Sequence, residues 1–170
     1  MVRCMALREI LVWPDECLKK KAEEIKDIDL HIVILAEDMT QTMYAAPGVG
    51  LAAPQVGISK QLIVLNPQAK TGTGNLMVII NPRIVAGDGK DTETEMCLSV
   101  PNVSVDITRH SHVLVKGIDL KGKEIELEAD GLIARVIQHE IDHLNGRVIL
   151  NYASSLKRSI YLKKAQKSKV

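Results

Sequence analysis

The sequence is poor in aromatic residues and cysteines, and it contains no long hydrophobic run. Its 170 residues include no Phe, one Trp and three Tyr, so the core must be built from Ile, Leu, Val and Met. So few rings leave almost no platform on which the bases of single-stranded nucleic acid stack. No apolar run reaches the ~18 residues that a membrane span needs. Neither DNA nor a membrane is therefore expected as a partner.

The cysteines and the N-terminus indicate a reducing compartment. Cys4, Cys17 and Cys97 are far apart and form no C-x-x-C pair, which is unlike the disulfide framework of a small secreted domain. The first residues carry too much charge for a signal peptide. These features predict a cytoplasmic protein whose thiols stay reduced.

The charge is balanced overall but divided along the chain. Residues 1–146 hold 15 Lys and Arg against 21 Asp and Glu, whereas residues 147–170 hold seven Lys and Arg and no acid. The length and the ordinary composition, 46% hydrophobic and 25% charged, predict one globular domain over residues 1–170. Residues 153–170 then form a basic C-terminal helix, whose simplest interpretation is a solvated face.

Hydrophobic spacing predicts an α+β fold. Helical periodicity marks residues 27–46, 131–144 and 153–168, with Asp27 or Asp29 as a cap of the first helix. Short apolar or alternating runs predict strands at 61–66, 76–81, 112–119 and 124–129, the last two as a hairpin. We therefore expect antiparallel sheets wrapped around a central metal-binding helix, with helices at the N- and C-terminal ends.

The central helix carries an H-E-x-x-H motif, His139-Glu140-Ile141-Asp142-His143. Histidines at positions i and i+4 project from one helix face, so both imidazoles can reach the same metal ion. Glu140 is placed to act as general base on a water at the metal. The alternative, an exposed charged turn, is disfavoured because the flanking apolar residues put this helix in the core, where unpaired charges are costly. Those residues are Leu132, Val136, Ile137 and Leu144.

A catalytic metal site needs a third protein ligand and one open position. Ile149 stands where the extended metalloprotease motif has its third histidine, and residues 144–170 contain no Asp, Glu, His or Cys. The third ligand must therefore come from upstream, where Cys97 is the strongest candidate. The other upstream candidates are interpreted as structural or exposed residues: Cys4, Cys17, His31, His110 and His112.

A glycine-rich segment, Gly48–Gly57, partly matches a dinucleotide-binding fingerprint. A helix rather than a strand precedes it, Pro54 interrupts it, and no acid follows in residues 54–87 to bind a ribose. We interpret it instead as a loop whose small residues let a ligand approach the backbone. Gln55 offers an amide N–H that can stabilise an oxyanion beside a metal.

Together these segments resemble the peptide deformylase family. The family has a G-φ-G-φ-A-A-x-Q loop, an E-G-C-L-S segment and an H-E-x-D-H helix in that order. Gly48–Gln55 and His139–His143 match the first and third. Glu95–Ser99 matches the second except that Met96 replaces the family's glycine. Ile10–Asp15 also resembles the family's N-terminal strand and turn.

The resemblance implies a role for each matched residue. Cys97, His139 and His143 would bind the metal, and Glu140 would be the general base and acid. Gln55 and the backbone N–H of Leu98 would stabilise the oxyanion. Gly50 would pair its backbone with the substrate peptide, and Val49 would help line the methionine pocket.

The implied activity is removal of the N-formyl group from the initiator methionine of new polypeptides, with release of formate. The cofactor would be one divalent metal ion, natively Fe2+, with Zn2+, Ni2+ or Co2+ able to occupy the site. The substrates would be N-formylmethionyl peptides. The resemblance also allows the basic helix at 153–170 to dock on the ribosome.

Three further expectations concern the neighbours of the metal site. Glu95 and Arg109 match positions that the family keeps charged, so we expect an ion pair, with two independent surface charges as the alternative. Met96 should be tolerated because strand side chains alternate and it would point away from Glu95 and Cys97. Asp142 is either a carboxylate that orients a ligand histidine or a surface carboxylate.

Two other functions remain open. An H-E-x-x-H zinc metallopeptidase acting on internal peptide bonds fits the motif, although its downstream ligand is missing. A catalytically inactive metal-binding module is the non-enzyme alternative, although Glu140 and the other motif residues are retained.

Overall fold

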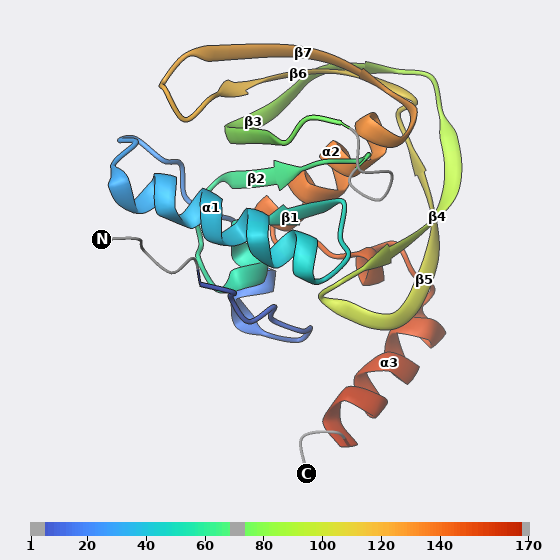
Figure 1. The fold of residues 1–170 in the computed structure, drawn as a ribbon. Helices are drawn as coiled ribbons and strands as arrows, with labels where there is room; N and C mark the ends of the chain where they lie inside the picture. The colour runs from blue at the N-terminus through green and yellow to red at the C-terminus, as the bar shows by residue number, and fades with distance from the viewer. Residues whose placement is uncertain (1–5, 69–73, 168–170) are drawn as a thin grey trace.

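Two antiparallel sheets and three α-helices make up the described part of the chain, residues 6–68 and 74–167 of a computed structural model (Figure 1). The helices are α1 (Leu30–Ala45), α2 (Gly131–Leu144) and α3 (Ser155–Lys167). The strands are β1 (Gly50–Ala52), β2 (Leu62–Leu65), β3 (Met77–Asp88), β4 (Asp91–Cys97), β5 (Val100–Arg109), β6 (His112–Ile118) and β7 (Glu124–Asp130). The larger sheet has the order β1-β2-β3-β6-β7, and β4 pairs with β5 in the smaller one. The predicted α+β fold, with antiparallel sheets around helix 131–144, is confirmed.

The larger sheet lies between α1 and α2, and alternate side chains of β2 pack against the two helices. Ile63 and Leu65 belong to the apolar cluster that contains the buried side of α2. Leu62 and Val64 belong to the cluster that contains the buried side of α1. Successive strand residues point to opposite faces, so a strand packed on both sides reads as one continuous apolar run.

The smaller sheet packs on a different part of the molecule. Its buried side chains share an apolar cluster with the segment after α2 and with α3, and this cluster contains Cys97, Val100, Val105, Ile107, Val148, Ile149, Leu150 and Tyr161. The hairpin β4–β5 thus stands beside α2 (Figure 1) without sharing its apolar cluster.

Most predicted elements occur where they were expected. Asp29 caps α1, since its Oδ1 accepts a hydrogen bond from the N–H of Ile32 at 3.0 Å. The predicted hairpin is formed by β6 and β7, and the predicted helix 131–144 is α2. The small-residue loop becomes the edge strand β1 followed by a 3-10 helix, Ala53–Val56. A dinucleotide fold, which requires a strand before this segment and a helix opening from it, is thereby excluded.

Three boundaries differ from the prediction. The strand expected at 76–81 continues to Asp88, because Asn81 adopts a φ of 50° and the register shifts there, which accommodates Pro82. The strand expected near Ile10–Asp15 is absent. That segment is instead extended, and the N–H groups of Leu11 and Trp13 donate to the carbonyls of Gln55 and Ser99. The turn expected at 71–74 lies mostly outside the described residues.

The C-terminal helix begins at Ser155 rather than at residue 153, and its apolar face differs from the expected one. Tyr161 and Ala165 pack on the body, whereas Leu156 and Ile160 are 70% and 47% exposed. Lys157 and Arg158 donate to backbone carbonyls of the body. No helix among the described residues is long and apolar enough to cross a membrane.

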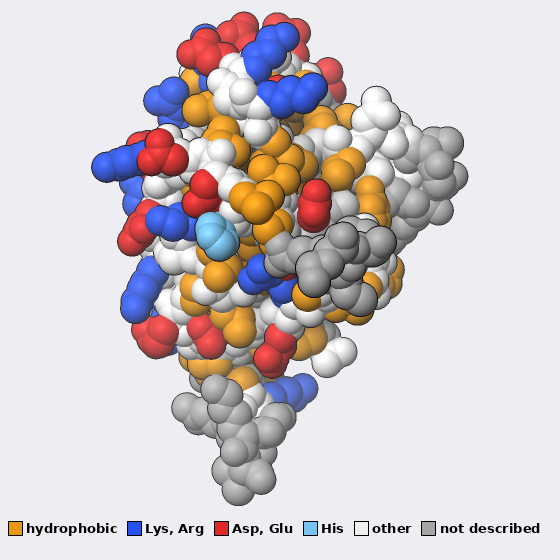
Figure 2. All heavy atoms as spheres, turned by 60° about the vertical axis from the view of Figure 1, so that its left-hand side comes forward, with side chains coloured by type: hydrophobic (Ala, Val, Ile, Leu, Met, Phe, Trp, Pro, Cys, Tyr) orange, Lys and Arg blue, Asp and Glu red, His pale blue; other side chains and the backbone are white. Residues whose placement is uncertain are grey.

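The surface carries both signs of charge close together. On the face in Figure 2, basic and acidic side chains alternate and hydrophobic side chains gather between them. The acidic excess of residues 1–146 therefore does not form a single acidic patch on this face.

Candidate metal centre

Two elements bring three metal-binding side chains together. His139 and His143 lie one turn apart on α2, and Cys97 is the last residue of β4. One ligand atom from each residue lies within 4.8 Å of the others. The Sγ of Cys97 is 3.2 Å from the Nε2 of His143. The structure thus brings together the three residues expected to hold a metal.

The pKa values of the two histidines are shifted in opposite directions. Burial lowers the pKa of His143, helped by the positive charges of His139 and Arg109, so its imidazole is neutral. Burial acts the same way on His139, but hydrogen bonds with Cys97 and Glu95 outweigh it and raise its pKa. A site that draws a proton onto His139 also attracts a metal cation, and a neutral imidazole at His143 is the form that ligates.

Glu95 orients His139. Its Oε2 accepts a hydrogen bond from the Nδ1 of His139 at 2.9 Å, which leaves the Nε2 of that ring for the metal side. Arg109 binds the same carboxylate through two nitrogens, so the expected ion pair is confirmed. Burial alone would raise the pKa of Glu95, but the hydrogen bonds with Arg109 and His139 lower it to about 2. Glu95 is therefore a buried carboxylate that stays charged.

Asp142 takes a role that neither alternative described. It binds the Nη1 of Arg109 at 2.9 Å and accepts a hydrogen bond from the hydroxyl of Tyr152 at 2.8 Å. It contacts neither ligand histidine by a hydrogen bond, and the Nδ1 of His143 has no hydrogen-bond partner. Asp142 thus holds Arg109, which in turn holds Glu95.

Glu140 lies beside the cluster and is almost fully buried from solvent. It is 4% exposed, and its Oε2 has no hydrogen-bond partner. Burial raises its pKa to about 7. A Cβ at Gly50 would overlap the Oε1 of Glu140 and lie 2.8 Å from the Cγ1 of Val136. The absence of a side chain at Gly50 therefore makes room for Glu140 against β1.

Gln55 points its amide nitrogen towards Cys97 and the metal-binding cluster. Its Oε1 accepts from the N–H of Ala52 at 2.8 Å, which fixes the orientation of the amide. Its Nε2 then donates to the Oγ of Ser99 at 3.2 Å and lies 3.9 Å from the Sγ of Cys97. The donor of Gln55 is thus held next to the metal-binding cluster.

A cleft of about 530 Å³ opens over these groups. It is lined by almost all of the residues that the sequence singled out, namely Val49, Gly50, Gln55, Cys97, Leu98, His139 and Glu140. His143 is 1% exposed and completes the cluster from within α2. Leu132, expected in the core, is 53% exposed and lines the cleft instead.

The remaining expectations for this region can be compared directly with the structure. Glu95 and Cys97 are buried on one side of β4, while Met96 is 77% exposed on the other. Met96 does not have a positive φ, so replacing the family's glycine introduces no backbone strain. Cys17, His31, His110 and His112 stand apart from the cluster, and Cys4 lies outside the described residues.

The residues fit a divalent metal ion. One thiol and two imidazoles form a donor set of the kind that holds zinc and other borderline-soft divalent metals. The buried cluster faces a cleft, which leaves access for a water or substrate. With a buried carboxylate alongside, this arrangement defines the class of metal-dependent hydrolases.

Comparison with known proteins narrows the class to one family. The family model for polypeptide deformylase matches residues 7–159. A peptide deformylase of Thermodesulfovibrio yellowstonii is 47% identical over 165 residues, which span 97% of this chain and 100% of the relative. A peptide deformylase of Syntrophobacter fumaroxidans is 45% identical over 163 residues, 96% of each chain.

Solved structures of peptide deformylases have the same fold as this chain. A Legionella pneumophila peptide deformylase superimposes with a TM-score of 0.89 at 42% identity, covering 96% of both chains. An Ehrlichia chaffeensis peptide deformylase in complex with actinonin gives 0.90 at 41% identity, covering 96% of this chain and 98% of that one. The chain belongs to the polypeptide deformylase family, whose members are metal-dependent enzymes.

Sequence reasoning missed several residues that support the site. Arg135 on α2 and Tyr152 after it complete the charged network around Glu95 and Asp142. Ser99 holds the Gln55 amide. Arg135 precedes His139 by four residues, so helical periodicity alone places it on the same face of α2.

Proposed function

We propose that the protein removes the N-formyl group from the initiator methionine of newly made polypeptides and releases formate. The observation that carries this proposal is the Cys97, His139 and His143 cluster with Glu140 beside it in an open cleft. Membership of the polypeptide deformylase family supplies the substrate class.

Cys97, His139 and His143 are the proposed protein ligands of one divalent metal ion. When bound, such an ion supplies a water that is acidic enough to lose its proton near neutral pH. A thiolate in the donor set favours a borderline-soft metal and makes the site sensitive to oxidation. We propose Fe2+ as the native ion, with Zn2+, Ni2+ or Co2+ as substitutes.

Glu140 is the proposed general base and acid. It accepts the proton of the attacking water and then delivers a proton to the nitrogen of the leaving amine. A pKa of about 7 allows a carboxylate to do both near neutral pH. The unpartnered Oε2 of Glu140 is free for this proton transfer.

Gln55 and the backbone N–H of Leu98 are the proposed donors to the formyl oxygen as it becomes negative. The bond between Gln55 and Ala52 fixes the amide in advance, so little reorganisation is needed when the charge develops. Gly50 would pair its backbone with the substrate, because β1 is the edge strand of the larger sheet and offers its free side to an extended peptide. Val49, which lines the cleft just before β1, would help to bind the methionine side chain.

A single set of assays separates this proposal from its alternatives. The protein, purified without oxygen and analysed for metal, is given a formyl-methionyl peptide and an internally quenched peptide. Formate release with no internal cleavage is the expected result. Cleavage of the quenched peptide would favour a metallopeptidase, and bound metal without any turnover would favour an inactive module.

We further propose one catalytic domain over residues 1–170, located in the cytoplasm, with the basic C-terminal helix docking on the ribosome. Lys163 is exposed on α3, and Leu156 and Ile160 leave apolar surface uncovered there. Phosphate contacts of ribosomal RNA would make such binding sensitive to salt.

Deleting residues 153–170 should abolish ribosome binding, but it also removes the buried Tyr161. Lys163→Glu is a milder test, with Lys121→Glu at the β6–β7 turn as its matched control. At one fixed low salt concentration, cosedimentation with ribosomes should be weaker for Lys163→Glu than for the wild type and unchanged for Lys121→Glu, and binding of the wild type should decrease as the salt concentration rises. Equal binding by the two variants and by the deleted chain would contradict the docking proposal.

A further inference from the structure

The metal-binding cluster joins two parts of the molecule that do not share an apolar core. The buried apolar residues of α2 pack with the larger sheet, whereas those of β4 and β5 pack with Val148–Leu150 and Tyr161. Yet Cys97 comes from the second part and both histidines come from the first. The apolar contacts of the hairpin reach only Val148–Leu150, after the end of α2, so polar contacts between α2 itself and the hairpin help to fix the position of Cys97 relative to His139 and His143.

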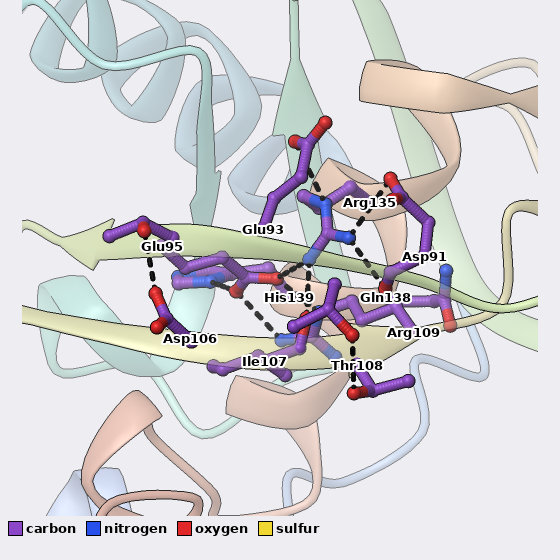
Figure 3. A network of polar contacts seen from close by, with 12 residues as sticks. Asp91, Glu93, Glu95, Asp106, Ile107, Thr108, Arg109, Arg135, Gln138 and His139 are labelled. Atoms are coloured by element: carbon purple, nitrogen blue, oxygen red, sulfur yellow. Dashed lines mark hydrogen bonds and ion pairs between the residues drawn. The ribbon is translucent and has the colours of Figure 1, made fainter.

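Arg135 makes more of these polar contacts than any other residue of α2 described here. Its Nη1 donates to the Oε1 of Glu95 at 2.8 Å and to the carbonyl of Ile107 at 3.0 Å. Its Nη2 donates to the carbonyl of Asp91 at 3.0 Å. Glu93 and the side chain of Asp91 complete the set at 3.3 Å (Figure 3). One guanidinium from α2 thus binds both strands of the smaller sheet.

Burial strengthens the electrostatic attraction in these contacts. Arg135 is 6% exposed and Glu95 is 6% exposed, so their charges are poorly screened by water. Asp91 and Glu93 are more exposed and neutralise the outer side of the guanidinium. Glu95 accepts from Arg135 on one oxygen and from His139 on the other, and these two residues lie one helical turn apart.

We infer that Arg135 is a positioning residue that locks the Cys97 hairpin onto α2 and thereby sets how firmly the site retains its metal. It acts through Glu95 on His139 and through the backbone of β4 and β5 on Cys97. A lysine cannot replace it fully, because one ammonium cannot reach Glu95 and two carbonyls in a planar fork. This inference rests on the proposed metal site.

Metal release from the loaded enzyme tests the inference. The wild type, Arg135→Met and Arg135→Lys are loaded with zinc, mixed with excess of a chromogenic chelator, and followed by absorbance. Loss of an outer-shell partner typically weakens metal binding about 10–100-fold. We expect Arg135→Met to release zinc faster by about that factor, with Arg135→Lys in between.

A matched control separates positioning from general destabilisation. Arg8 binds the buried Asp38 through two nitrogens at 3.1 and 2.9 Å, and neither residue lines the cleft or belongs to the metal-binding cluster. Arg8→Met should lose stability but release zinc at the wild-type rate. In cobalt-loaded protein, only the Arg135 variants should alter the thiolate-to-metal absorption band.

The possible outcomes test the Arg135 inference and the proposed metal site separately. Zinc release from Arg135→Met at the wild-type rate would overturn the inference and leave the proposed function intact. If Arg135→Met does not fold, Arg135→Lys decides, and a wild-type release rate for it would overturn the inference. A wild type that retains no metal would overturn the proposed metal site itself, whatever the variants do.

Discussion

Helix α2 and the hairpin β4–β5 both contribute to the candidate metal centre, but different forces hold them in place. Apolar contacts with the larger sheet position α2, through fully buried residues such as Ile137. Charged hydrogen bonds centred on Glu95 position the hairpin beside α2, and Arg109 and Arg135 contribute them. Packing on the larger sheet thus places the histidine pair, whereas Cys97 is placed relative to it by these charged hydrogen bonds together with the apolar contacts of the hairpin with Val148–Leu150.

This difference has a consequence for the site. Apolar packing is non-directional and tolerates small changes in contact, whereas hydrogen bonds to a carboxylate fix distance and angle. A three-residue metal site assembled from both regions needs the directional contacts where the two regions meet. We therefore expect variants of the apolar side to change folding stability and variants of the charged side to change the metal.

Among variants that keep all three metal ligands, the largest effect on catalysis is expected on the α2 side, from Glu140→Gln. The amide keeps the shape of the side chain but cannot accept a proton, so turnover should fall by roughly 10²–10⁴-fold. Formate release measures the rate, and metal analysis of the same sample should find a full site. Loss of the metal in this variant would show that Glu140 holds the ion, and would break the division of roles between the residues.

The next largest effect is expected at the edge of the cleft, from Gly50→Ala. The added Cβ would overlap the Oε1 of Glu140 and displace this carboxylate. Misplacement of a catalytic group by ~1 Å can cost about 10²-fold in rate. Gly48→Ala is the matched control, because its Cβ would meet the flexible Cδ1 of Leu98 at 3.1 Å and the loss should be smaller. Equal losses would contradict the role of Gly50.

A pH-dependent stability difference is expected on the charged side, from Glu95→Gln in the metal-free protein. The folded pKa of Glu95 is about 2, below the ordinary value of 4.5. Its charge therefore stabilises the fold above pH 4.5, by roughly 2–4 kcal/mol, and this contribution is lost as the pH falls towards 2.

Urea unfolding of the wild type and of Glu95→Gln at several pH values measures the gap between them. Below the pH range in which His139 titrates, this gap should narrow between about pH 4.5 and pH 2. A gap that does not change with pH would mean that the charge of Glu95 contributes nothing to the fold.

The smallest effect is expected from Ile137→Val on the apolar side. Removal of one buried methylene should lower the free energy of unfolding by about 0.5–1.5 kcal/mol. Zinc release to a chelator should stay at the wild-type rate, because no metal contact or hydrogen bond changes. A faster release would show that the two regions are not held independently.

The sequence predicted the strongly periodic parts of this fold well. Residues 131–144 form a helix because their apolar side chains repeat at helical spacing, and the alternation at 112–119 and 124–129 gave the hairpin. The two strands of the smaller sheet were harder to predict. The first five residues of β4, Asp91–Glu95, include no apolar side chain, and Pro101 and Asn102 interrupt the start of β5. The alternation of apolar and polar residues over 103–108 was a strand signal that the prediction overlooked.

The parts of the site that lie within one sequence motif could be predicted, whereas the parts that only the fold brings together could not. His139 and His143 follow from their spacing, whereas Cys97 joins them only through the fold and was supported by resemblance to a family. Arg135 bonds to residues 28 to 44 positions away in the sequence. Leu132 and Leu156 were misplaced because an exposed apolar residue at a cleft or on a terminal helix reads like a core residue.

X-ray absorption at the metal edge of the zinc-loaded protein measures directly whether Cys97, His139 and His143 bind one metal ion. We expect one sulfur scatterer at about 2.3 Å and two histidine nitrogens at about 2.0–2.1 Å from the zinc. In Cys97→Ser the sulfur shell should disappear and formate release should nearly vanish. A sulfur shell that persists in Cys97→Ser, or a wild-type spectrum without sulfur, would contradict a metal centre assembled from α2 and the β4–β5 hairpin.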